Sequence, residues 1–153
     1  ALNEVSVSRV SASMLGVDVQ VDGAALPTYW ADGLLVATST GSTAYSLSVG
    51  GPICTPDSKV SIISPISPHN LNVRPLIVPR DSRINLSLQS RDLSSVFTMD
   101  NRNHIIPAGT HIEITTTGRK LQRLCIDKDN FFDALRSRLL WGSDVRNLKS
   151  STE

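Results

Sequence analysis

The sequence predicts a mainly β protein, an antiparallel multi-stranded β-sandwich with one short helix in its first half and a C-terminal helix. Three observations support this fold class. Short apolar segments alternate with polar residues in a period of two, and turn sequences separate them at intervals of roughly ten residues. Serine and threonine supply 32 of the 153 residues, which suits turns and strands better than helix interiors. Only two stretches have the spacing or the glycine exit of a helix.

The alternation is clearest in residues 5–8 and 17–21, where valine occupies every second position. Asp22-Gly23 follows the second of these and predicts a tight turn into a return strand, because such pairs favour hairpin turns. The complete set of strand candidates is 5–8, 17–21, 24–26, 34–38, 60–63, 76–78, 84–88, 96–99, 112–116 and 121–126. Turn sequences at 79–82, 100–103, 107–109 and 117–119 separate most of them.

Two segments break the strand pattern. Residues 43–49 follow a Gly-Ser turn and stop at the glycine pair 50–51, which predicts a brief helix with a glycine exit. Residues 129–141 carry apolar side chains at helical spacing and end before Gly142. We expect this second helix to pack on the sheet.

The length suits a single domain, which we place at residues 1–144, with a flexible tail over 145–153. The chain opens without an initiator methionine, so we expect it to be cut from a longer polypeptide. The formal net charge is only +1, which argues against a protein that coats nucleic acid. No apolar run approaches the roughly 20 residues of a membrane helix. We therefore expect a cytoplasmic protein with no nucleic-acid or membrane partner.

The two cysteines offer little chemistry. Cys54 and Cys125 lack the spacing of a zinc site, and no histidine stands at ligand distance in the sequence. Without a secretion signal we expect two reduced, partly buried thiols. We assign no metal-binding residue.

The most informative segment runs from Asp32 to Pro52 and combines a buried strand, a hydroxyl-rich glycine turn, a helix N-terminus and a second glycine turn. A helix N-terminus suits phosphate, ribose or adenine edges, because its N–H groups lack partners. Gly41 permits a turn that a side chain would obstruct, and nearby hydroxyls at 40, 42 and 43 add donors. No Gly-Lys-Ser/Thr follows, so this is not a P-loop. Spacing alone favours the plainer interpretation, in which these residues only cap a helix.

The identity of the motifs adds to the spacing. They are Asn3-Glu4, Asp32-Gly33, the string from Ser39 to Tyr45, Gly50-Gly51-Pro52, Pro65-Ile66-Ser67-Pro68-His69, Arg74-Pro75-Leu76 and Leu140-Trp141-Gly142. In this order they cover most of the chain, which resembles the C-terminal domain of the NAD kinases. The resemblance implies an all-β domain that faces an α/β N-terminal domain, with NAD between the two.

For the adenosine part of NAD, the resemblance implies five residues. Asn3 and Glu4 match the pair that holds the ribose, where a carboxylate accepts hydrogen bonds from a diol and an amide both donates and accepts. Thr43 and Ala44 match positions that meet the adenine edge. Tyr45 matches an aromatic that packs near the nucleotide, worth on the order of 1 kcal/mol. Each also has a plain interpretation: Asn3-Glu4 as a solvated strand start, Tyr45 as core.

The resemblance implies further contacts around the same cleft. Asp32 matches the acidic residue that reaches the nicotinamide ribose, often in the site of a neighbouring subunit, although Asp32-Gly33 is also a plain turn sequence. Thr40 and Ser48 flank the cleft.

Two positions depart from the family's pattern. Trp30 stands where many relatives have a basic residue, and Arg102 stands where relatives often have glutamine. Arg102 is our candidate for a phosphate contact, because its guanidinium carries a charge that glutamine lacks. To His69 we assign a structural or loop-orienting role, since no partner for it is visible.

The resemblance implies phosphoryl transfer to the 2′-hydroxyl of the NAD adenosine ribose, giving NADP, from ATP or polyphosphate with Mg²⁺ or another divalent cation. The family's catalytic Gly-Gly-Asp-Gly motif, whose Asp is the assigned general base, does not occur in this sequence. We therefore assign no catalytic residue and expect this chain to build half of the NAD pocket without catalysing the reaction. We expect the cation and its nucleotide to bind mainly outside this chain. The resemblance also implies a homodimer or homotetramer.

Two other hypotheses stay open. A lipid kinase of the diacylglycerol or sphingosine type shares the two-domain plan, but the Asn-Glu pair and the Thr-Gly-Ser-Thr-Ala-Tyr string favour NAD over lipid. A non-catalytic nucleotide-binding or oligomerisation module is the third hypothesis.

Overall fold

The computed structural model describes residues 1–119, 121–122, 124 and 130–143, which fall into two compact units. The first unit is Ala1–Gly118 and the second belongs to Arg119–Glu153. The prediction of one domain over 1–144 with a tail over 145–153 stays a prediction.

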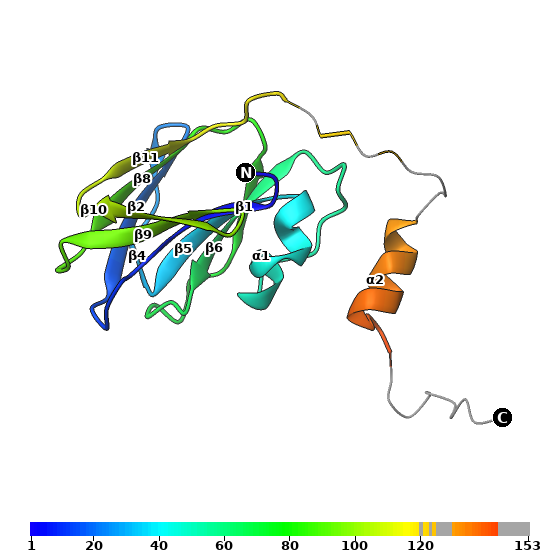
Figure 1. Ribbon diagram of the computed structural model, residues 1–153, viewed down its shortest axis with the longest axis horizontal. Helices are drawn as coiled ribbons and strands as arrows, with labels where there is room; N and C mark the ends of the chain where they lie inside the picture. Colours follow the sequence, from blue (N-terminus) through cyan, green and yellow to red (C-terminus); the bar gives the residue numbers. More distant parts are fainter. Residues whose placement is uncertain (120, 123, 125–129, 144–153) are drawn as a thin grey trace. The chain divides into compact units, whose positions relative to one another are not determined.

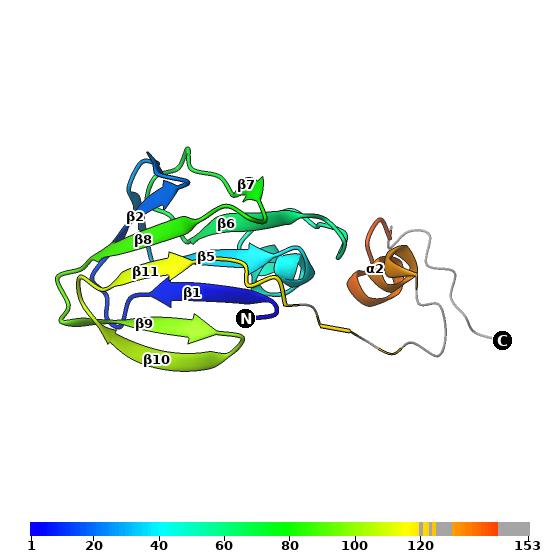
Figure 2. The same cartoon turned by 90° about the horizontal axis from the view of Figure 1, so that it is seen from above.

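The first unit contains two antiparallel sheets (Figures 1 and 2). The six-stranded sheet has the order β10-β9-β1-β5-β6-β7. Its strands are β1 (Glu4–Ser8), β5 (Gly33–Thr38), β6 (Val60–Ile66), β7 (Leu76–Pro79), β9 (Ser94–Met99) and β10 (Arg102–Pro107). The first strand of the chain therefore lies in the middle of this sheet, between β5 and β9.

The second sheet has the order β11-β8-β2-β3, and β4 also pairs with β2. Its strands are β2 (Leu15–Val21), β3 (Ala24–Ala25), β4 (Tyr29–Ala31), β8 (Ile84–Gln89) and β11 (His111–Ile114). The predicted hairpin forms between β2 and β3, and Asp22 and Gly23 take positive φ angles of 51° and 85° in its turn. The chain crosses from one sheet to the other between β1 and β2.

The core lies between the two sheets, which confirms the predicted sandwich. Alternation directs Val7 of β1, Val17 of β2 and Leu34 of β5 inward, and all three are fully buried. Ile84 and Leu86 of β8 join them from the second sheet. Burial of each such side chain contributes about 1.5–3 kcal/mol, so the alternating valines of the sequence account for much of the fold's stability.

Two strands were not among the sequence candidates. Tyr29–Ala31 forms β4, whose three residues are too few to show alternation. Arg102–Pro107 forms β10, an edge strand that pairs only with β9 among the described strands and ends on a proline. The turn expected over 100–103 is correspondingly shorter and consists of Asp100 and Asn101. Residues 123, 125 and 126 of the predicted strand at 121–126 lie outside the described residues.

The short helix predicted over 43–49 is divided in two. A 3₁₀ turn, η1, covers Thr40–Thr43, and the helix α1 covers Tyr45–Ser48. Ala44 separates them with φ −98° and ψ −132°, which is not helical backbone. Gly50, with φ +83°, provides the expected glycine exit.

The second unit contains α2 (Phe131–Leu139), which the sequence placed at 129–141. Asn130 caps its N-terminus by accepting a hydrogen bond from the Phe132 N–H at 3.0 Å, and Leu140 ends it in the left-handed conformation. The predicted packing of this helix on the sheet stays a prediction. Across the described residues, no helix is long and apolar enough to cross a membrane.

Candidate functional site

A pocket of about 270 Å³ opens on the outer face of the six-stranded sheet, the face turned away from the core. Strands β1, β6 and β9, the β9–β10 turn and α1 all contribute to it. Its lining residues are Glu4, Ser6, Ser8, Tyr45, Ile66, Thr98 and Asn101. Most of these are polar, so the pocket suits a hydrogen-bonding ligand rather than a hydrocarbon chain.

The alternation of β1 builds the floor of this pocket. Val5 and Val7 face the core, so the residues between and around them, Glu4, Ser6 and Ser8, project to the opposite face. Thr98 of β9 pairs with Ser6 and therefore joins the same face. A row of hydroxyls thus leads away from the Glu4 carboxyl along the strand.

Glu4 is the charged group of the pocket. One of its carboxylate oxygens, Oε2, is buried and has no hydrogen-bond partner. Burial raises the pKa of Glu4 above its ordinary value of 4.5, the nearby Asp100 charge raises it further, and a hydrogen bond from the Tyr45 backbone N–H opposes both. A buried carboxylate oxygen without a donor is costly, so this oxygen marks a place where a ligand hydroxyl would be stabilised.

The glycine turn before α1 packs directly against the start of β1. A Cβ atom at Gly41 would lie 2.1 Å from the Asn3 carbonyl oxygen, so only glycine allows this approach. The Thr38 N–H donates to the same Asn3 oxygen at 2.8 Å, and the Thr38 hydroxyl donates to the Leu2 carbonyl at 2.7 Å. The turn and the Asn3-Glu4 pair are far apart in sequence, but these contacts join them into one structure.

Two hydroxyls of this turn have a structural task. The Ser39 hydroxyl donates to the Pro56 carbonyl at 3.1 Å. The Ser42 hydroxyl is fully buried, donates to the Cys54 carbonyl at 3.2 Å and accepts from the Cys54 N–H at 3.0 Å. Ser42 therefore does not add a donor to the outer lip, contrary to the expectation from sequence. Cys54 is a half-buried free thiol, as predicted, whereas Cys125 lies outside the described residues.

Ser42→Ala is expected to lower the free energy of unfolding by about 1–2 kcal/mol, because the Cys54 N–H and carbonyl lose a buried partner. Urea unfolding measures this loss. Thr43→Ala, which removes an exposed hydroxyl from the same turn, is the control and is expected to stay within about 0.5 kcal/mol of the wild type. Equal effects of the two substitutions would contradict the structural task of Ser42.

Tyr45 begins α1 and forms a wall of the pocket, with 43% of its surface exposed. Its partial exposure excludes the interpretation of Tyr45 as a core residue and leaves part of the side chain accessible to a ligand. Ala44 beside it is half-buried. The predicted residues Thr40, Thr43 and Ser48 are exposed around this wall and are not among the lining residues.

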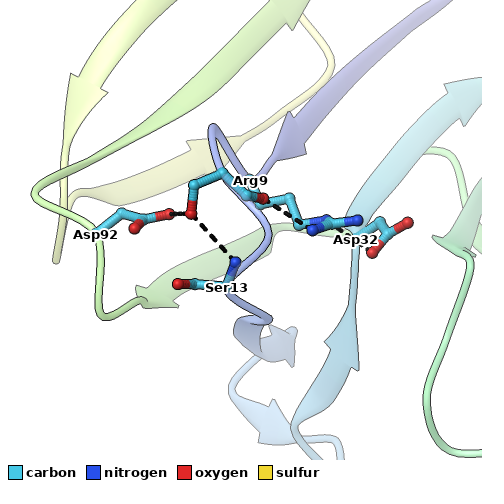
Figure 3. Close-up of polar contacts among 5 residues, drawn as sticks. Arg9, Ser13, Asp32 and Asp92 are labelled. Atoms are coloured by element: carbon cyan, nitrogen blue, oxygen red, sulfur yellow. Dashed lines mark hydrogen bonds and ion pairs between the residues drawn. The ribbon is translucent and has the colours of Figure 1, made fainter.

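Asp32 lies at the other end of β1 from Glu4. Its carboxylate accepts from the Arg9 Nε at 2.8 Å, and the Arg9 N–H donates to the Asp32 carbonyl at 3.0 Å. Figure 3 shows this pair with Asp92 nearby. The Asp92 carboxylate accepts a hydrogen bond from the Ser11 hydroxyl at 2.7 Å. The structure thus separates Asp32 from the Glu4–Tyr45 part of the predicted set and ties it to the β1–β2 loop.

Arg9→Ala is expected to cost at most about 1 kcal/mol of stability, since both side chains of the pair are partly exposed. The loss is expected to shrink in 1 M salt, which screens exposed charges. Urea unfolding at low and high salt measures it. A loss well above this value that salt does not reduce would contradict the assignment of an exposed pair.

The remaining candidates lie away from the pocket. Arg102 pairs with Met99, which pairs in turn with Val5, so the register places it on the opposite face of the sheet from Glu4. His69 is exposed, and its backbone N–H donates to the Trp30 carbonyl at 2.8 Å, which suits its predicted loop role. The phosphate contact of Arg102 stays a prediction.

A second cavity of about 540 Å³ lies at the other sheet, lined by Ala12, Ser13, Met14, Trp30, Gln89, Ser90 and Arg91. The Trp30 ring lies against Gly16, where a Cβ atom would approach it to 2.9 Å. None of its lining residues is one that the resemblance assigned to NAD. Trp30 is the position at which the sequence departs from the family's pattern.

The residues that the structure describes hold no group of three or more His, Cys, Asp or Glu side chains suited to a metal ion.

Sequence reasoning found Glu4 and Tyr45 but missed the rest of the lining. Ser6 and Ser8 could have been found, because the alternation of β1 places them on the face of Glu4. Thr98 and Asn101 could not, since only the pairing of β1 with β9 brings them there.

Together, the fold and the pocket define a β-sandwich domain with a polar small-molecule site on the outer face of one sheet. The family model described as the ATP-NAD kinase C-terminal domain matches residues 2–125. The chain therefore belongs to this family.

Curated relatives agree with the family assignment. An NAD kinase of Cytophaga hutchinsonii is 44% identical over 148 residues, which are 96% of this chain and 51% of the relative. An NAD kinase of Flavobacterium johnsoniae is also 44% identical over 148 residues, with 96% of this chain and 50% of the relative covered. The chain thus spans about half the length of the curated relatives it matches.

Solved structures resemble the chain as well. Yeast NADH kinase, solved in complex with NADH, matches 97% of this chain and 46% of that chain with a TM-score of 0.86 and 28% identity. An Archaeoglobus fulgidus NAD kinase in complex with ATP matches 77% of this chain and 46% of that chain, with a TM-score of 0.70 and 29% identity. The predicted fold class is confirmed by the first of these matches.

Proposed function

We propose that this chain is the dinucleotide-binding domain of an NAD kinase and that the Glu4–Tyr45 pocket receives the adenosine part of NAD. The observation that carries the proposal is the buried, unpartnered Oε2 of Glu4 in a polar pocket. A ribose diol supplies the hydroxyl donors that such an oxygen lacks. The likeness to relatives named NAD kinase, and to a kinase solved with NADH, supports the same ligand class.

Each wall of the pocket has a task in this proposal. The Glu4 carboxylate accepts from the ribose hydroxyls, and the hydroxyls of Ser6 and Thr98 continue the polar floor. The Tyr45 ring offers an apolar face to the adenine, with Thr43 and Ala44 beside it. The chain binds and orients the nucleotide in this way, while the sequence holds no Gly-Gly-Asp-Gly motif to supply the general base.

The complete enzyme, in this proposal, transfers a phosphoryl group from ATP or polyphosphate to the 2′-hydroxyl of the adenosine ribose and releases NADP. Mg²⁺ or another divalent cation accompanies the donor outside this chain. Asp32, Thr40 and Ser48 contact more distant parts of the dinucleotide, Asp32 in a neighbouring subunit of a homodimer or homotetramer. We place the enzyme in the cytoplasm.

Calorimetric or NMR titration of the chain with NAD, into the millimolar range, tests the proposal. Tyr45→Ala is expected to weaken binding by about fivefold, the value of one lost stacking contact of about 1 kcal/mol. Trp30→Ala is the matched control, because Trp30 is also a partly exposed aromatic but lines the second cavity. Binding weakened by Trp30→Ala and not by Tyr45→Ala would reject the site, and binding of diacylglycerol in place of NAD would favour the lipid-kinase hypothesis.

A further inference from the structure

We propose that Asp100 is a positioning residue of the dinucleotide pocket, which holds the Leu2–Glu4 backbone in place so that the Glu4 carboxyl points at the ligand. The inference rests on the proposed function. Asp100 contributes nothing to the pocket lining itself. It acts on Glu4, which does line the pocket.

The contacts of Asp100 are concentrated on three consecutive residues. Its carboxylate accepts from the backbone N–H groups of Leu2, of Asn3 at 2.8 Å and of Glu4 at 3.2 Å. The Asp100 N–H donates back to the Glu4 carbonyl at 3.2 Å. Burial opposes ionisation of Asp100, but these N–H donors outweigh it, and the pKa of Asp100 is lowered. The residue is therefore an anionic clamp on the start of β1.

The conformation of the turn indicates that the carboxylate is there for this clamp. Asp100 and Asn101 have φ angles of 41° and 68°, the left-handed pair of a two-residue hairpin turn. Asparagine or glycine would satisfy such a turn equally well, without placing a second negative charge beside Glu4. The same turn delivers Asn101 to the pocket wall, so it fixes two sides of the site at once.

The clamp meets a second set of contacts from the opposite side. Thr38 donates to the Asn3 carbonyl, and Gly41 packs against the Asn3 backbone, so this backbone is held on both sides. Asn3 itself does not line the pocket. The Asn3 backbone lies between Asp100 and the glycine turn. Because Glu4 is the next residue, contacts that fix the Asn3 backbone also fix the direction of the Glu4 side chain.

Few other charges face Glu4 in the part of the chain that the structure describes. Asp100 comes from the β9–β10 turn, and the Tyr45 phenol is the titratable group on the α1 wall. Ala37, which pairs with Glu4 on β5, carries no charge. The register places Arg102 on the other face of the sheet. The Asp100 charge is therefore the neighbour whose removal changes the ionisation of Glu4.

The test compares Asp100→Asn with the wild-type chain in an NMR titration with NAD over a range of pH. We expect Asp100→Asn to weaken NAD binding at neutral pH by about tenfold, the usual value of charge-assisted hydrogen bonds. We also expect the acid limb of the affinity profile to move to lower pH, because Glu4 loses a like-charged neighbour. A residue that only supported the fold would lower affinity at every pH alike. Asp92→Asn, a turn aspartate outside the pocket, is the control.

Each remaining outcome is decisive. Affinity within twofold of the wild type, or an unmoved acid limb, would overturn the positioning role while leaving the proposed function intact. Absence of NAD binding by the wild-type chain would overturn the proposed function and this inference with it. If Asp100→Asn does not fold, amide exchange in the wild type decides: protected Asn3 and Glu4 N–H groups support the clamp, and exchange at the rate of free amides rejects it.

Discussion

Glu4→Gln is expected to weaken NAD binding by roughly 10- to 100-fold, because a hydrogen bond to a charged group is worth about 1.5–3 kcal/mol. The neutral amide keeps the size and one acceptor of the side chain but loses the charge that attracts the ribose hydroxyls. Titration of the variant with NAD measures the loss. Glu113→Gln is the control, since Glu113 lies on β11 in an exposed pair with Arg83 at 3.2 Å.

The same substitution is expected to stabilise the unliganded chain at pH 7. Because burial raises the pKa of Glu4, the folded state binds its proton more tightly than the unfolded state does. The contribution of Glu4 to stability is therefore lost as pH rises from about 4.5 through the raised pKa, and glutamine is free of this loss. Thermal unfolding at pH 7 and pH 4 checks this sign. We expect Glu4→Gln to be more stable than the wild type at pH 7 but not at pH 4. Destabilisation at pH 7 would contradict the inference that burial disfavours the ionised form of Glu4.

Gly41→Ala is expected to cost about 3 kcal/mol of folding stability and to abolish detectable NAD binding, because the new Cβ meets backbone rather than a movable side chain. Either the glycine turn or the Asn3-Glu4 strand start must shift, and both build the pocket. A loss of this size lowers the melting temperature by roughly 6–12 °C in a chain of this length. Thermal unfolding and NAD titration measure the two effects.

Gly23→Ala separates this steric effect from the cost of glycine's conformational freedom. Gly23 has φ +85° but open space around its position, so alanine there costs about 1 kcal/mol and leaves the pocket unchanged. If the two glycine variants lost equal stability, the close approach of Gly41 to Asn3 would not be the cause.

The sandwich could be predicted from sequence because its signal is local. Val5 and Val7 on β1 and the alternating valines of β2 already define an inner and an outer face. The strands that escaped prediction, β4 and β10, are too short or too polar for alternation to show, and pairing with β2 and β9 creates them. The break at Ala44 within the predicted helix follows a turn in which Gly41 packs against the Asn3 backbone, a contact that local sequence does not reveal.

A smaller part of the site was predictable, for a different reason. Glu4 and Tyr45 stand in short motifs whose residue identities mark them, although their positions in the chain differ by 41. The turn sequence at Asp100 predicts a hairpin but not its contact with β1, and Thr98 stands in no motif, since the roles of both depend on the register of β9 against β1. The sequence analysis predicted an exposed Ser42 hydroxyl, whereas this hydroxyl is buried and bonded to the Cys54 backbone. The loop that carries Cys54 has no periodic pattern from which this contact could be predicted.

An NMR titration of the ¹⁵N-labelled chain with NAD locates the dinucleotide site on the chain, because it maps the contacts of a ligand even when binding is weak. We expect the largest amide shifts to cluster at Glu4, Ser6, Tyr45, Thr98 and Asn101. Shifts that cluster instead around Trp30 and Gln89, or no shifts at millimolar NAD, would contradict it.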